Sequence, residues 1–336
     1  MLLPFLPAAS DPWRLLTPQN VAVRRAWPWS YSIQKFIDLG EPRPRASKRL
    51  LIASDYGGEH RQSTHHIYCY LVVRGGGSQW LSAIGAARRT LPDRRKMCYK
   101  RLDDRHRQEA LVSFLKAAAN LDGHLVAIAV DKRKKWLSTQ PGCADDLGKM
   151  MGLTAKWNPR SLEAMMRKVQ FSAILLSIWS EPYTNITWIT DQDEFVANDT
   201  RHDDALLAAA RMSSFYVPHP MGIFRLNTTD QDPELTAYED LCAVPDLAAG
   251  MLSEISTRLS KDVVWEDGLR RALRAPLPLK TDIIADWFWD DSTTLRKTLI
   301  SIDMQGAKYG VRKIWMQEGG QPVLDDDVVS PVEATE

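Results

Sequence analysis

Three aspartates stand where an apolar run ends or where a helix of small residues begins. Asp55 closes RLLIASD, Asp191 closes ITWITD, and Asp246 precedes Leu-Ala-Ala-Gly. Carboxylates gathered at strand ends can hold Mg²⁺ or Mn²⁺, which are hard cations that prefer oxygen ligands. Two such ions, about 4 Å apart, can activate water and stabilise a leaving oxygen in phosphodiester cleavage. The joint placement therefore predicts a divalent-metal site, in which Glu59 adds a ligand or positions water.

Simpler interpretations exist for each candidate taken alone. An aspartate after a strand is a common turn residue or helix N-cap. His60 lies close to the predicted site in sequence and is a candidate for proton transfer, whereas the paired His65 and His66 at a strand entrance are more often surface or partly buried residues than metal ligands. Asp131, followed by Lys-Arg-Lys-Lys, reads best as part of a solvated loop. The sequence shows no phosphate-binding glycine loop and no dinucleotide fingerprint.

A strongly basic segment covers residues 88–107, with the sequence RRTLPDRRKMCYKRLDDRHR. Such a segment can bind phosphates through its cations while an aromatic side chain stacks on a base. A solvated surface explains the same composition equally well, so both interpretations stay open. The formal net charge of +1 argues against a protein that coats nucleic acid indiscriminately. The residues predicted to contact nucleic acid are Arg94, Arg95, Lys96, Tyr99, Lys100 and Arg101.

The elements that must position these residues follow from the hydrophobic pattern. Strands first, then alternating strands and helices, predict an α/β fold with a mixed sheet and helices packed on it. Apolar runs predict strands, and amphipathic spacing predicts helices. The expected strands cover residues 50–55, 66–73, 124–132, 186–191 and 221–227, and the expected helices cover 78–91, 105–121, 161–179, 203–212 and 245–259.

The two ends of the chain differ from the middle. Residues 1–48, rich in proline, tryptophan and arginine, are predicted to form an N-terminal arm whose apolar start packs on the domain or on a partner. That start lacks a basic leader and is too short to span a bilayer, and no later run reaches membrane length. Residues 260–317 are predicted to be a helical extension and a possible protein-binding region, and residues 318–336 an acidic disordered tail.

Composition narrows the class of protein. A hydrophobic fraction of 44% and a charged fraction of 25% are those of an ordinary globular chain. The four cysteines are widely scattered, without a close pair that could chelate zinc. Reduced thiols and the absence of an apolar run long enough for a membrane indicate a cytoplasmic protein.

The order of these motifs resembles the ribonuclease H-like fold, and more narrowly a family of bacterial and phage proteins known only as a domain of unknown function (DUF3800). That family opens with a strand ending Asp-Glu-Ser-Gly and closes with a helix reading approximately Gln-Leu-Ala-Asp-Leu-Ile-Ala-Gly. The resemblance covers about residues 49–255. The matching motifs are Ser54-Asp55-Tyr56-Gly57-Gly58, Cys98-Tyr99-Lys100-Arg101-Leu102, Val130-Asp131-Lys132, Asp191, and the run from Leu241 to Gly250 that contains Asp246.

The resemblance implies a ribonuclease H-like domain over residues 49–259 and a nuclease site built on Asp55, Asp191 and Asp246 with Mg²⁺ or Mn²⁺. The sequence departs from the family at Tyr56, where a Glu is usual, and around Lys96, where a second metal-binding Glu is expected. The loss of a ligand can abolish metal binding while it leaves the fold intact. A catalytically inactive scaffold that binds nucleic acid or a partner protein is therefore the alternative hypothesis.

Overall fold

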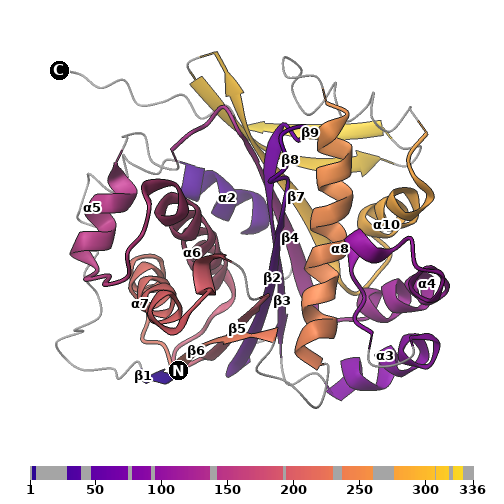
Figure 1. The fold of residues 1–336 in the computed structure, drawn as a ribbon, viewed down its shortest axis with the longest axis horizontal. Helices are drawn as coiled ribbons and strands as arrows, with labels where there is room; N and C mark the ends of the chain where they lie inside the picture. Colours follow the sequence, from indigo (N-terminus) through magenta and orange to yellow (C-terminus); the bar gives the residue numbers. More distant parts are fainter. Residues whose placement is uncertain are drawn as a thin grey trace.

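A nine-stranded mixed sheet organises the chain in the computed structural model (Figure 1). The strand order is β1-β6-β5-β2-β3-β4-β7-β8-β9. The strands are β1 (Leu2–Pro4), β2 (Arg49–Gly57), β3 (His65–Arg74), β4 (Gly123–Asp131), β5 (Asn185–Thr190), β6 (Ile223–Thr228), β7 (Arg296–Gln305), β8 (Lys308–Gln317) and β9 (Gln321–Asp327). The structure describes residues 2–4, 29–38, 47–74, 78–91, 95–136, 142–191, 194–229, 237–259, 276–306, 308–317 and 321–327.

The strand directions divide the sheet into an antiparallel meander and parallel flanks. β3 runs antiparallel to both β2 and β4, and its antiparallel pairing with β2 is the one that the hairpin-distance spacing predicted. On the other side of β2, β5 and β6 run parallel to it and to each other. β7 runs parallel to β4, and β8 and β9 continue antiparallel.

Helices cover both faces of this sheet, so the described molecule has three layers (Figure 1). On one face lie α2 (Trp29–Asp38), α5 (Cys143–Met150), α6 (Pro159–Trp179) and α7 (Asp199–Tyr216). On the other face lie α3 (Ser78–Thr90), α4 (Arg105–Ala119), α8 (Ala237–Thr257) and α10 (Leu279–Trp289). Two short 3₁₀ helices, η1 (Tyr99–Arg101) and η2 (Glu194–Val196), complete the described helical elements.

Side-chain alternation in the central strands feeds two separate cores. On β3, Tyr68 and Tyr70 belong to the core shared with α6, whereas Cys69 and Leu71 belong to the core shared with α8. Successive residues of a strand point to opposite faces, and a strand buried on both faces is apolar throughout. β4 shows this pattern, since every residue from Leu125 to Val130 is buried.

The longest helix on the first face begins where local capping chemistry predicts. The side chain of Asn158 accepts a hydrogen bond from the backbone N–H of Ser161, and Pro159 occupies the first turn of α6. Proline is tolerated there because the first turn has no intrahelical partner for its missing N–H. The α/β class, the mixed sheet and the flanking helices predicted for the middle of the chain are confirmed.

The C-terminal third differs from the expectation. The helix predicted over residues 282–302 is present only in its first part, as α10, and the helical character expected for the rest of the extension up to residue 317 is wrong where β7 and β8 form. The disorder expected for the acidic tail is also wrong for residues 321–327, which pair with β8 as β9. β7 has a partner far away in sequence, β4, and the periodicity of the segment alone does not reveal that partner.

The N-terminal arm contributes two described pieces to the domain. Residues 2–4 pair antiparallel with β6, so the expectation that the apolar start packs on the domain is confirmed for them. Helix α2, which the sequence did not predict, buries Trp29, Ile33 and Phe36 in the core on the α6 side. The segments around residues 5–28 and 260–275 lie outside the described residues.

Among the described residues, none of the helices is both long enough and apolar enough to cross a membrane.

Candidate functional site

The ends of β2 and β5 bring Asp55 and Asp191 next to each other. The two strands are parallel and aligned so that Ala53 is opposite Ile189, which makes Asp55 and Asp191 the next pair on the same face. Ala53 and Ile189 both pack in the core shared with α8. Neighbouring strands lie about 4.8 Å apart, so the two aspartates start from adjacent backbones on the α8 side of the sheet.

Helix α8 supplies the third carboxylate, Asp246, from above this end of the sheet. The helix comes down closely on the end of β2, where a Cβ added to Gly57 would lie 2.8 Å from the carbonyl oxygen of Ala249. Only glycine leaves room for that approach. The contact therefore sets the height of α8 over the sheet and places Asp246 beside Asp55.

The carboxyl groups of Asp55 and Asp246 perturb each other. Burial raises the pKa of Asp55 well above its usual range, and the charge of Asp246 and a hydrogen bond between the two carboxyls raise it further. Burial also raises the pKa of Asp246. The hydrogen bonds that Asp246 accepts from Asp55, Tyr99 and Cys98 lower this pKa but do not cancel the effect of burial. Two carboxyl groups this close share a proton when no cation separates them. Nearby Asp191 adds to the repulsion on both, and a divalent cation would relieve it.

Tyr99 forms part of the frame that holds Asp246. Its backbone N–H donates to Asp246 Oδ2 (2.7 Å), and its hydroxyl shares a hydrogen bond with Thr281 Oγ1 (2.8 Å). The ring lies against Gly250 of α8, where an added Cβ would be 2.1 Å from the ring. Because Tyr99 is only 7% exposed, the expectation that its ring is free to stack on a base is wrong.

Asp191 has its own partners. The hydroxyl of Thr229 donates to Asp191 Oδ1 (2.7 Å), and Lys96 Nζ lies 3.7 Å from the same oxygen. The side chains of Lys96 and Asp191 are 41% and 49% exposed, so this ion pair is partly solvated. Lys96 thus places a positive charge where a second metal-binding carboxylate was expected.

The three aspartates are neighbours without forming a closed ligand set. Within the part of the chain that the structure describes, Asp55, Asp191 and Asp246 are not a group whose candidate ligand atoms all lie within 4.8 Å of one another. One ion held by all three would therefore require their side chains to rotate inward. Asp55 and Asp246 alone are already in hydrogen-bonding range.

The other predicted site residues spread over the nearby surface. Glu59 is exposed in the loop that leaves β2, after the left-handed turn at Gly58 (φ 78°). Arg95 donates to Asp104 Oδ2 (2.7 Å), which ties it to the start of α4. Lys100 and Arg101 on η1 are exposed, and Arg94 lies outside the described residues. Among the basic residues of this set that the structure describes, Lys96 is the one paired with an aspartate of the site, Asp191.

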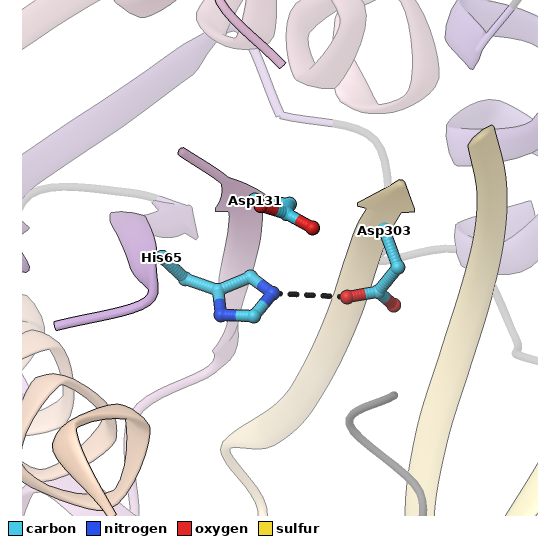
Figure 2. A group of neighbouring side chains, drawn as sticks. All are labelled: His65, Asp131 and Asp303. Carbon is cyan, nitrogen blue, oxygen red and sulfur yellow. Dashed lines mark hydrogen bonds and ion pairs between the residues drawn. The ribbon is translucent and has the colours of Figure 1, made fainter. Parts of the chain in front are cut away.

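A second group of possible metal ligands lies at the same end of the sheet (Figure 2). His65 from β3, Asp131 from β4 and Asp303 from β7 each offer an atom, and these atoms all lie within 4.8 Å of one another. His65 Nε2 is 2.9 Å from Asp303 Oδ1. All three residues are buried, at 3% exposure each.

Sequence reasoning found this second group only in part. The paired histidines were considered as metal ligands, but Asp131 was assigned to a solvated loop, which is wrong because its side chain is buried. Asp303 was missed because its segment was predicted to be helical. A pairing of β7 with β4 was the signal needed, and it depends on contacts across more than 160 residues of chain.

A scan against protein-family models found no match for this sequence, and a search of curated proteins also found none.

Proposed function

We propose that the protein is a divalent-metal-dependent nuclease that cleaves phosphodiester bonds, with Asp55, Asp191 and Asp246 as the residues that hold the metal. The observation that carries the proposal is the convergence of these carboxylates from β2, β5 and α8 on one face of the sheet. Hard carboxylate oxygens are the ligands that Mg²⁺ and Mn²⁺ prefer, so the residues present fit these ions.

The strand arrangement supports a ribonuclease H-like fold for the central part of the chain. An antiparallel meander (β2, β3, β4) is followed by two strands, β5 and β6, parallel to the first strand on its other side. Helices α6 and α7 make the two crossovers, and α8 follows β6 and returns over the meander. Fold alone does not define an activity, so the site carries the functional argument.

The chain's own residues have defined roles in this proposal. Asp55 and Asp246, which share a proton without a cation, would become full carboxylates when a cation binds. A bound divalent ion would supply Lewis-acid activation of the phosphate and a more acidic water. Lys96, together with the exposed Lys100 and Arg101, places positive charge beside the carboxylates for the phosphate backbone. Glu59, in the loop that leaves β2, is the candidate for positioning water or adding a ligand.

Isothermal titration of Mn²⁺ tests the metal site directly. We expect saturable binding by the wild type, and its loss in an Asp55→Asn/Asp246→Asn double variant, which keeps side-chain volume but removes both charges. The titration is repeated with a non-cleavable oligonucleotide, because substrate phosphates can complete such a site. Wild-type protein that binds no Mn²⁺ under either condition would contradict the proposal.

Cleavage assays then test the activity. Fluorescent single- and double-stranded DNA and RNA are incubated with Mg²⁺ or Mn²⁺, and we expect cleavage that EDTA and the double variant both abolish. The variant Asp203→Asn, which changes a half-exposed aspartate of α7 on the other face of the sheet, is a matched control that should cleave normally.

A second candidate function is a catalytically inactive ribonuclease H-like scaffold that binds nucleic acid or a partner protein. The observation that favours it is the ion pair between Lys96 and Asp191, which places an ammonium where a second ion would be needed. The two candidates differ in metal binding. Mn²⁺ should raise the melting temperature of a nuclease through ligand linkage and leave a scaffold unchanged.

A further inference from the structure

We propose that His65, Asp131 and Asp303 form a separate binding site for a transition-metal dication of the Zn²⁺ type, which cross-links β3, β4 and β7. The group combines one imidazole nitrogen with two carboxylates, all buried and all with candidate ligand atoms within 4.8 Å of one another. Imidazole suits Zn²⁺ and similar ions, whereas Mg²⁺ is suited by oxygen ligands. The inference does not depend on the proposed nuclease activity.

The hydrogen bonds around His65 point to a positive charge between its ring and Asp303. Thr64 Oγ1 donates to the carbonyl oxygen of Ser256 (3.0 Å), which can only accept. The single hydroxyl proton of Thr64 is thereby used, so His65 Nδ1 must donate to Thr64 Oγ1 (2.8 Å). The lone pair of Nε2 then faces Asp303 Oδ1, itself an acceptor, at 2.9 Å. Either a proton, on the ring or on the carboxyl group, or a metal ion must therefore lie between these two atoms.

Hydrogen bonds from neighbouring groups hold His65 and Asp303 in place, as they do for the ligands of metal sites. Ser301 Oγ donates to Asp303 Oδ2 (2.6 Å), and Thr64 fixes the ring of His65. Metal-bound histidines commonly donate their other ring N–H to an oxygen, and metal-bound carboxylates are themselves hydrogen-bonded.

Asp131 is oriented by donors from Arg133 and Met304. The backbone N–H of Arg133 donates to Asp131 Oδ1 (2.8 Å), its guanidinium donates to both carboxylate oxygens (2.6 Å from Nη2 to Oδ2), and the backbone N–H of Met304 donates to Oδ2 (3.2 Å). Arg133 also compensates part of the charge of two buried carboxylates. With a neutral His65, the carboxylates of Asp131 and Asp303 and the guanidinium of Arg133 have a net charge of −1. A bound dication changes this net charge to +1, and a bound proton changes it to zero. The experiment must therefore separate a metal ion from a proton.

The pair of His65 and Asp303 needs only a small change to accept an ion, and Asp131 offers its ligand atom within 4.8 Å of both. Zn²⁺ lies about 2.1 Å from nitrogen and oxygen ligands, so ligand atoms around a tetrahedral ion are about 3.4 Å apart. His65 Nε2 and Asp303 Oδ1 would therefore separate by a few tenths of an ångström from 2.9 Å. A water molecule can complete the coordination, as in other sites with three protein ligands.

This group is distinct from the carboxylate site. Thr64 binds Ser256, and Asp246 precedes Ser256 by ten residues on α8. A helix rises about 1.5 Å per residue, which puts the two sites about 15 Å apart under the same helix.

The test uses the full chain with Asp55→Asn and Asp246→Asn, so that the carboxylate site cannot contribute. After removal of metals with a chelator, Zn²⁺ is titrated calorimetrically, and Co²⁺ is titrated with detection of its visible absorption. We expect one ion per chain and a higher melting temperature. Addition of His65→Gln should weaken binding at least about 100-fold, and Ser301→Ala about tenfold, as losses of ligands and of their hydrogen-bond partners do.

A matched control is available on β4. His124 is also buried and also bonds a residue of β7, through its Nε2 and Thr298 Oγ1 (2.7 Å), but without a carboxylate. His124→Gln should lower stability in a similar way and leave Zn²⁺ binding unchanged. Zn²⁺ affinity that survives His65→Gln, or a folded parent chain that binds no Zn²⁺ or Co²⁺, would overturn the site and leave a proton between His65 and Asp303 in its place.

If His65→Gln does not fold, spectra of ¹⁵N-histidine-labelled parent chain with and without Zn²⁺ decide the matter. Zn²⁺ should shift the ring resonances of a single buried histidine, and Ser301→Ala should weaken that change. Spectra in which only exposed histidines respond would also overturn the proposal.

Discussion

At the scale of single residues, the electrostatic cost of the carboxylate site falls on the buried carboxyl groups of Asp55 and Asp246. Burial and mutual repulsion raise the pKa of both carboxyls, so the folded chain holds a proton between them to higher pH than isolated aspartates would. A pair of this kind destabilises the chain when it is fully charged, and a bound cation reverses that effect. Sites of this type often trade stability for function.

The first prediction concerns the pH dependence of Asp55→Asn. Because its pKa is raised in the folded state, Asp55 contributes stability that is complete below about pH 4, the unfolded range, and is lost as pH rises through the folded pKa. We expect metal-free Asp55→Asn to match the wild type near pH 4 and to exceed its free energy of unfolding by about 1–2 kcal/mol at neutral pH. Denaturant unfolding in EDTA across this range measures the difference.

Two comparisons make that result specific. Asp103→Asn, at an exposed position beside Lys280, should change the free energy of unfolding by no more than about 0.5 kcal/mol. Mn²⁺ should stabilise the wild type and leave Asp55→Asn unaffected. A variant that is less stable than the wild type at neutral pH without metal would show that the charge of Asp55 is compensated by groups other than a cation.

The sequence predicted the positions of these aspartates but not their surroundings. Asp55 and Asp191 follow apolar strands, and parallel pairing brings such residues together, so local pattern was sufficient for them. Tyr99 was expected to be a free aromatic because its neighbours are basic. Its burial depends on Gly250, about 150 residues later, and no local pattern encodes that contact.

At the scale of elements, close approach between α8 and its neighbours determines where Asp246 lies. We predict that Gly250→Ala lowers the free energy of unfolding by about 1–3 kcal/mol, because its Cβ would overlap the ring of Tyr99. The displaced ring would also disturb the hydrogen bond from Tyr99 N–H to Asp246 and weaken Mn²⁺ binding.

Gly85→Ala in α3 is the matched control for this prediction. No atom lies within 4 Å of the Cβ position at Gly85, so alanine should stabilise the helix by about 0.5–1 kcal/mol. Thermal unfolding and Mn²⁺ titration of both variants separate a packing effect from the general effect of replacing a helical glycine. Equal changes in both variants would exclude the role assigned to Gly250.

Another element-scale prediction concerns the connection between α5 and α6. The buried carboxylate of Asp204 on α7 accepts hydrogen bonds from the backbone N–H groups of Thr154 and Ala155 and from Trp157 Nε1. Asp204→Asn offers one acceptor oxygen instead of two and directs an amide toward these donors. We expect a loss of about 3 kcal/mol, from donors left unsatisfied in the interior.

Denaturant unfolding of Asp204→Asn measures this loss, and Asp203→Asn is its neighbour control. The side chain of Asp203 is 48% exposed, so its change should stay within about 0.5 kcal/mol. A similar effect of the two substitutions would mean that the loop does not depend on the carboxylate.

Whether a segment forms a helix or a strand was predictable where its hydrophobic pattern was long and regular. Helix α6 and strand β4 follow directly from their periodicity, and their bounds differ from the prediction by about two residues or fewer. Residues 296–305 were assigned to a helix although they contain Ile300, Ile302 and Thr298, which favour strands. A short apolar segment does not distinguish the two states, and here a parallel partner, β4, decides between them.

At the scale of the whole molecule, the sheet continues past the boundary predicted near residue 259. β7 pairs with β4 in parallel, and Leu299 and Ile300 from β7 enter the two cores on opposite faces. β7 therefore covers the β4 edge of the meander. Without β7, apolar side chains on both faces of the sheet would be exposed at that edge. This arrangement also supplies Asp303 to the second metal site.

The last prediction tests that continuity with two truncations. A chain that ends at residue 295 lacks β7–β9 and exposes the backbone edge of β4 together with apolar side chains on both faces, which favours aggregation. Among the described elements, a chain that ends at residue 317 lacks just the edge strand β9, which pairs with β8. We expect the longer chain to be monodisperse by size-exclusion chromatography and to unfold cooperatively, and the shorter chain to do neither. A shorter chain that unfolds cooperatively would instead show that residues 1–295 fold without β7–β9, and Asp303 would then be an addition to a self-sufficient fold.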